Sequence, residues 1–101
     1  MKIIIESTNF ESSTSLNKFI KEKAGVFLRL DKNALFAEFN LSANKSEFTC
    51  TIILNLAGKD VVASRTADDM HYAILKAIDA AKRSMRRKKM KTITKTKKGK
   101  L

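Results

Sequence analysis

Two alternating patterns run through residues 35–56, LFAEFNLSANKSEFTCTIILNL, and they determine which fold this chain can adopt. Apolar side chains occupy every second position from Leu35 to Ala43, and again from Phe48 to Leu56. A period of two with one polar face is typical of antiparallel strands that are covered on one side only. We therefore predict two strands joined by a short turn, with a covering layer on one face of the sheet.

The flanking segments predict two more strands and two helices. Residues 2–8 are rich in β-branched side chains, which favours a strand, and residues 61–64 indicate a brief fourth strand. Apolar residues recur at helical spacing over residues 14–30, which predicts an amphipathic helix. A second apolar stripe predicts a long helix from about residue 67 to 89, with Thr66 as its N-terminal cap.

The order of the predicted elements is strand, helix, three strands, helix. Because each helix is apolar along one stripe, the economical arrangement is a four-stranded sheet with both helices packed on one face. The fold class is α+β, β-α-β-β-β-α, similar to a double-stranded-RNA-binding domain. A chain of this length fits one domain, which we place at residues 1–90. Residues 91–101 are rich in Lys and Thr without an apolar period, which predicts a basic flexible tail.

Positive charge is concentrated at one end of the chain. The formal net charge is +11, from 21 Lys and Arg against 10 Asp and Glu. Residues 1–79 contain all 10 acids and 10 of the basic residues, so their charges cancel, and residues 80–101 contain the other 11 basic residues. Such a local excess is typical of a protein whose partner has a dense negative surface, and a solvated basic end that adds solubility is the simpler alternative.

The chain lacks the groups of residues that catalysis or metal binding needs. It has 1 His, 1 Cys and 1 Tyr, which excludes a Cys/His metal cluster and a two-histidine site. We interpret His71 as a surface or packing residue and Cys50 as an inert core residue. Helix capping accounts for Asp68 and Asp69 better than a metal site or an acid–base pair does. We therefore expect no enzyme activity, no metal and no cofactor.

The composition also indicates a compartment. No apolar run approaches the roughly 20 residues of a membrane span. The apolar run at the N-terminus is too short for a signal peptide, and a lone cysteine agrees with a reducing environment. We expect a cytoplasmic protein that does not contact membranes.

Basic side chains surround the second predicted helix on every side except its apolar stripe. Like charges three or four residues apart weaken a helix by roughly a few tenths of a kcal/mol per pair, and bound phosphates offset this repulsion. The uncovered sheet face offers Phe36 and Ile53 among polar residues, which is a weak platform for stacking bases. We favour contact between the second helix and folded RNA through backbone and shape.

The start of the second helix resembles a known family. Residues 62–70, VASRTADDM, are followed by Tyr72, Ala73 and Ile74 and by a basic helix end. This pattern is similar to that of the short ribosome hibernation-promoting factors, which are related to ribosome-associated inhibitor A. The likeness extends from the N-terminus to about residue 91. The chain departs from the family pattern at His71, Tyr72 and Leu75.

The resemblance implies a function and a set of binding residues. Such proteins bind in the small-subunit groove for messenger RNA and the A- and P-site transfer RNAs, and they block translation sterically during stasis. The implied partner is the ribosomal RNA of the small subunit, with no small-molecule substrate and no membrane, and the free protein is expected to be a monomer. The residues implied to bind RNA are Lys76, Lys82, Arg83, Arg86, Arg87, Lys89, Lys91 and Lys23.

Two other functions are compatible with the same residues. A general double-stranded RNA or nucleoid-binding protein would bind any duplex with similar affinity. A regulator that acts through protein partners would bind RNA weakly and with little dependence on salt.

Overall fold

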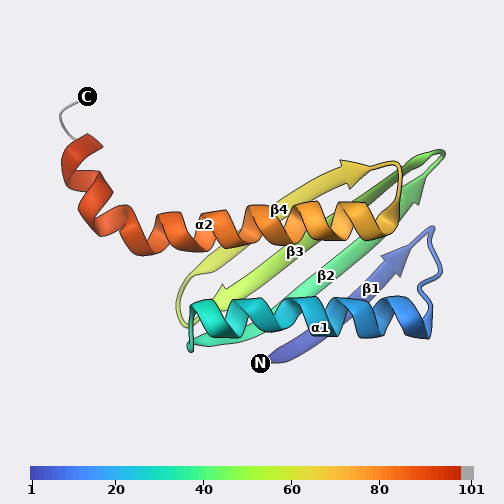
Figure 1. Cartoon of the computed structure of the whole chain (residues 1–101), viewed down its shortest axis with the longest axis horizontal. Helices are drawn as coiled ribbons and strands as arrows, with labels where there is room; N and C mark the ends of the chain where they lie inside the picture. Colours follow the sequence, from blue (N-terminus) through green and yellow to red (C-terminus); the bar gives the residue numbers. More distant parts are fainter. Residues whose placement is uncertain (99–101) are drawn as a thin grey trace.

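The fold follows the predicted order of elements (Figure 1). The computed structural model describes the backbone of residues 1–98 and the side chains of residues 1–86. Its elements are β1 (Lys2–Thr8), α1 (Thr14–Leu30), β2 (Ala34–Asn44), β3 (Glu47–Leu56), β4 (Asp60–Ala67) and α2 (Met70–Lys98). The predicted β-α-β-β-β-α order is therefore confirmed.

The four strands form one mixed sheet in the order β1-β2-β3-β4. β1 pairs with β2 in parallel, whereas β2 with β3 and β3 with β4 are antiparallel pairs. A parallel pair needs a crossover connection, and α1 supplies it by crossing the face of the sheet. Both helices lie on the same face, and their N-termini lie at the same end of the molecule (Figure 1).

The core lies between the two helices and one face of the sheet. Phe39 of β2 and Ile52 of β3 are fully buried, and they belong to one apolar cluster with Phe27 of α1 and Ile74 of α2. These residues come from the alternating positions and helical stripes that the sequence shows. The prediction that β2 and β3 are covered on one side only is confirmed.

Leu35 departs from the predicted face of β2. We expected Leu35 to begin the buried row, but its side chain is 55% exposed, whereas Ala34 is 4% exposed. The pairing shifts at this point, because Ala34 and Phe36 pair with the adjacent residues Leu56 and Asn55. Leu35 is the extra residue of a β-bulge, which turns its side chain toward solvent.

Asp69, and not Thr66, caps α2. Thr66 lies within β4, where its hydroxyl is 3.0 Å from the hydroxyl of Thr49. Asp69 Oδ2 accepts a hydrogen bond from the backbone N–H of Tyr72 at 3.3 Å, and its carbonyl accepts one from Ala73 at 2.9 Å. The predicted cap was wrong because β4 is longer than the brief strand that we expected, so the helix begins later.

α2 is longer than predicted at its C-terminal end. It spans Met70–Lys98, whereas we predicted a helix end near residue 89 and a flexible tail beyond it. Lys has a high helix propensity, and neither Gly nor Pro interrupts the helix before Gly99. Residues 91–98 continue the helix past the sheet (Figure 1), and residues 99–101 of the predicted tail lie outside the described residues.

Substitutions at two leucines of β2 test the bulged register. Leu35→Ser changes a side chain that faces solvent, so we expect the free energy of unfolding to change by less than about 0.5 kcal/mol. Leu41→Ala leaves a cavity in the core and should lower that free energy by about 2–5 kcal/mol. Urea denaturation followed by circular dichroism measures both values. A core-sized loss for Leu35→Ser would show that Leu35 is buried.

Substitutions at the start of α2 test the assigned cap. Asp69→Ala removes the side-chain acceptor at the helix N-terminus, so we expect the free energy of unfolding to fall by about 0.5–2 kcal/mol. Asp69→Ser keeps an acceptor and should restore most of the loss. Thr66→Val breaks only an exposed hydroxyl pair and should cost less than Asp69→Ala. A larger loss for Thr66→Val than for Asp69→Ala in urea denaturation would show that Thr66 caps α2.

Candidate nucleic-acid interface

α2 presents one row of exposed side chains to solvent. On its opposite side Ile74, Ala77 and Ala81 are fully buried in the core. Residues three or four positions apart share a helix face, so the buried stripe determines which side chains point outward. The outward row consists of Tyr72, Lys76, Asp79, Arg83 and Arg86.

Weak contacts hold the outward row together. Arg83 Nη2 lies 2.6 Å from Asp79 Oδ2, and the two side chains are 65% and 51% exposed. An exposed ion pair of this kind contributes about 0–1 kcal/mol, so Arg83 can exchange Asp79 for a phosphate at little cost. Lys76 Nζ lies 5.3 Å from the centre of the Tyr72 ring, which is a cation–π contact. These cations are therefore accessible to a large anionic ligand.

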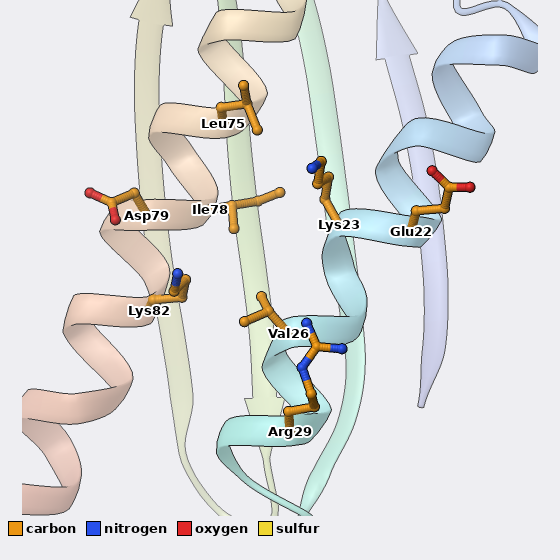
Figure 2. A pocket seen from close by; sticks show the side chains of 8 residues that line it. All are labelled: Glu22, Lys23, Val26, Arg29, Leu75, Ile78, Asp79 and Lys82. Atoms are coloured by element: carbon orange, nitrogen blue, oxygen red, sulfur yellow. The ribbon is translucent and has the colours of Figure 1, made fainter.

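An open groove runs between the two helices (Figure 2). We call it the inter-helix groove; its volume is about 390 Å³. Val26 of α1 and Leu75 and Ile78 of α2 supply its apolar lining. The charged residues along it are Glu22, Lys23 and Arg29 of α1 and Asp79 and Lys82 of α2.

Acidic and basic side chains both line the inter-helix groove. Figure 2 shows the carboxylates of Glu22 and Asp79 directed away from each other, toward the outer sides of the two helices. Lys23 lies between these carboxylates, and Arg29 lies farther along α1. The inter-helix groove therefore has a small excess of positive charge, with three cations against two acids.

An aromatic contact joins the two helices near the N-terminus of α2. The rings of Phe19 and His71 have their centres 4.9 Å apart at an angle of 57°. Lys23 Nζ lies 5.7 Å from the centre of the Phe19 ring. His71 is exposed and packs against α1, which agrees with the interpretation of this histidine as a surface or packing residue.

The structure divides the predicted RNA-binding residues into two groups. Lys76, Arg83 and Arg86 belong to the outward row, whereas Lys23 and Lys82 line the inter-helix groove. The backbone of the remaining three lies in α2, and their side chains lie outside the described residues. These three are Arg87, Lys89 and Lys91. Whether any of the eight residues binds RNA stays a prediction.

Arg29 is a groove residue that the sequence reasoning missed. It lies in the last turn of α1, three residues after Val26 and six after Lys23, so all three share one side of the helix. This spacing was visible in the sequence. The pairing of α1 with α2, which places Arg29 and Lys82 along one groove, was not.

Acidic side chains gather at the opposite end of α2. A second hollow of about 290 Å³ lies where the two helices begin, and its lining includes Glu11, Asp68 and Asp69. Phe10 and Phe48, whose ring centres are 6.0 Å apart, complete its apolar part. Carboxylates are stabilised near helix N-termini by the helix dipole, so these acids fit a structural role.

The described residues offer little reactive chemistry. Cys50 is fully buried, and this burial raises the pKa of its thiol to about 12. Among the described side chains, residues 1–86, no three of His, Cys, Asp or Glu gather where they could bind a metal ion. In the same part of the chain, no helix is both long and apolar enough to span a lipid bilayer.

Comparisons with known proteins agree with this fold. Residues 3–93 match the family described as Sigma 54 modulation protein / S30EA ribosomal protein. No curated protein matches the chain in sequence.

Two solved structures have the same architecture. A ribosomal subunit interface protein from Coxiella burnetii is 16% identical, covers 88% of this chain and 98% of its own, and has a TM-score of 0.80. The N-terminal domain of Protein Y from Thermus thermophilus is 23% identical, covers 86% of this chain and 98% of its own, and also has a TM-score of 0.80. At these identities the likeness shows the fold.

The raised pKa of Cys50 predicts an unreactive thiol. The thiolate is the form that reacts, so iodoacetamide at about pH 8 should not label the native protein but should label it in denaturant. The free energy of unfolding should fall as the pH rises from 9.0 toward about 12, because the unfolded thiol loses its proton first. Mass spectrometry measures the labelling. Rapid labelling of native protein would show that Cys50 is exposed.

Proposed function

The chain belongs to the family described as Sigma 54 modulation protein / S30EA ribosomal protein, and from this membership we propose that it is a hibernation factor that binds the small ribosomal subunit. The family is one of ribosome-associated modulation factors. The proposed binding place of this chain is the groove of the small subunit that messenger RNA and the A- and P-site transfer RNAs use. Its proposed effect is to block translation during stasis by occupying that groove.

One observation carries the proposal: the cations of α2 are exposed and outnumber the nearby acids. Lys76, Arg83 and Arg86 point to solvent on the outward row, with Asp79 as the one acid among them. After Asp79 the chain contains no Asp or Glu. A surface with this charge attracts a polyanion, and ribosomal RNA is the polyanion that a ribosome-associated protein meets.

The proposed mechanism is steric occlusion held by electrostatics. The planar guanidinium groups of Arg83 and Arg86 bind phosphate oxygens in pairs, which fixes the orientation of α2 on the RNA. Lys23, Arg29 and Lys82 in the inter-helix groove approach a neighbouring part of the backbone. No covalent step is needed, because the bound domain excludes messenger and transfer RNA by its volume.

We assign ribosome binding to a single domain at residues 1–90. The basic residues 91–101 add positive charge after this domain for further contacts with the RNA backbone. We place this function in the cytoplasm. It requires no cofactor, and the free protein is a monomer.

The two alternative functions predict different behaviour in solution. A general double-stranded RNA or nucleoid-binding protein binds any duplex as well as it binds the small subunit. A regulator that acts through protein partners binds RNA weakly and with a flat salt dependence. A hibernation factor binds the subunit in preference to duplex RNA and competes with transfer RNA. Its log Kd rises by roughly 0.7–0.9 per decade of salt for each phosphate that it neutralises.

Charge reversal on α2 tests the proposal. We expect Arg83→Glu/Arg86→Glu/Arg87→Glu to lower the affinity for purified small subunits at least about tenfold and to reduce the salt slope by about two to three units, because three phosphate contacts become repulsive. Co-sedimentation across a salt series measures both quantities.

A matched control separates the site from the net charge. Lys2→Glu/Lys45→Glu/Lys59→Glu changes the net charge by the same amount at exposed positions on β1 and in two turns. We expect this variant to bind nearly as well as the wild type. Equal losses in the two variants would contradict a site on α2. Wild-type protein that does not co-sediment, or that binds any duplex equally well, would contradict the proposed function.

A further inference from the structure

Tyr72 is a large aromatic residue that lies outside the apolar core. Its side chain is 55% exposed, although it follows the buried Met70 by two residues and precedes the buried Ala73. An exposed aromatic ring forgoes the burial that usually stabilises a tyrosine. It stands at the N-terminal end of the outward row, on the same helix face as Lys76 and Arg83.

The neighbours of Tyr72 suit a nucleotide. Lys76 Nζ lies 5.3 Å from the centre of its ring, within reach of the phosphate of a nucleotide whose base stacks on that ring. Leu75 is 41% exposed beside it and borders the inter-helix groove, so the apolar area continues toward the cations of that groove. An aromatic ring with a cation beside it is an arrangement on which unpaired bases stack in single-stranded RNA recognition, and at Tyr72 that cation is Lys76.

The uncovered sheet face is less suitable for the same ligand. The hydroxyl of Thr49 is 3.0 Å from that of Thr66, and the hydroxyl of Thr51 is 2.9 Å from that of Ser64. These groups already satisfy one another across β3 and β4. Val62 is 61% exposed on the same face but has no ring, and the ring of Phe36 on this face is partly buried.

We propose that Tyr72 is a stacking site for one unpaired nucleobase of RNA, with Lys76 binding the adjacent phosphate. This inference rests on the proposed function, because it adds a contact to the same RNA-binding surface. The outward row then contains two kinds of contact. Arg83 and Arg86 bind backbone of any sequence, whereas Tyr72 requires a base that is not paired. An unpaired base therefore distinguishes a folded ribosomal RNA from a continuous duplex at this position.

The chain offers a direct probe, because it contains 1 Tyr and no Trp. Tyr72→Trp places a single indole at the proposed site. Excitation at the long-wavelength edge of indole absorption, where RNA absorbs little, then reports on this position alone. We expect strong quenching when the variant binds small subunits or protein-free small-subunit RNA, and no quenching with a continuous RNA duplex. Val62→Trp, with its indole on the uncovered sheet face, is the matched control and should not be quenched.

Affinity measurements provide the second readout. Stacking is sequence-tolerant and contributes through the ring, so Tyr72→Ala should lower the affinity for small subunits by about tenfold or more. Tyr72→Phe keeps the ring and should stay within about twofold of the wild type. Alanine is a better helix former than tyrosine, so the Ala variant is expected to fold.

The possible outcomes distinguish a failure of the inference from a failure of the proposed function. If Tyr72→Ala binds like the wild type while Arg83→Glu/Arg86→Glu/Arg87→Glu does not, the stacking site is wrong and the proposed function stands. If quenching occurs with subunits but not with protein-free RNA, Tyr72 contacts a ribosomal protein and the inference is again wrong. If the wild type does not bind subunits, the proposed function fails and the inference fails with it.

Discussion

The apolar inner face of β2 and β3 constrains every other part of the domain. Side chains alternate along a strand, so a register shift of one residue would turn the apolar side chains toward solvent and the polar ones toward the core. Phe39 and Ile52 must be covered, and α1 and α2 together provide the cover. Once Ile74 and Ala77 of α2 are buried there, the opposite side of that helix has to face solvent. The position of the outward row therefore follows from the packing of the core.

The small size of several buried residues of α2 strengthens this constraint. Ala73, Ala77 and Ala81 are fully buried, and none of them has a long side chain that could adapt to another position. A helix that packs through alanines approaches its neighbours closely, so a rotation about its axis would bring larger or charged residues into the core. α2 is thereby held at one rotation about its axis, so the side chains proposed to contact phosphates keep a fixed direction.

Most of the fold could be predicted from periodicity, and the errors arose where local pairing overrides it. A regular alternation placed Leu35 inside, but a bulge between Ala34 and Phe36 turned it outward, and a bulge leaves no clear trace in the apolar pattern. Thr66 and Asp69 are both good capping residues. Only the pairing of β4 with β3, which extends past Thr66 to Ala67, shows that Asp69 begins the helix.

The candidate site was predictable in composition but not in arrangement. The excess of basic residues after Asp79 pointed to α2, and the apolar stripe left the other sides of that helix to its cations. Arg29 was missed because its importance depends on how α1 lies beside α2, which no pattern within α1 reveals. Tyr72 was considered only as a departure from a family pattern. Its exposure and its contact with Lys76 became visible with the orientation of the helix.

The apolar core and the charged surface of this domain are separate, so substitutions on the surface can leave the core unchanged. No polar or charged side chain is buried among the described residues, so the core contains no ionic contact that the binding surface could disturb. Arg83 is held by one exposed pair, and Lys76 by one ring. Substitutions of these residues cost little in folding free energy, because exposed pairs contribute weakly. Affinity for a polyanion can therefore be tuned along the outward row while the packing that orients α2 stays intact.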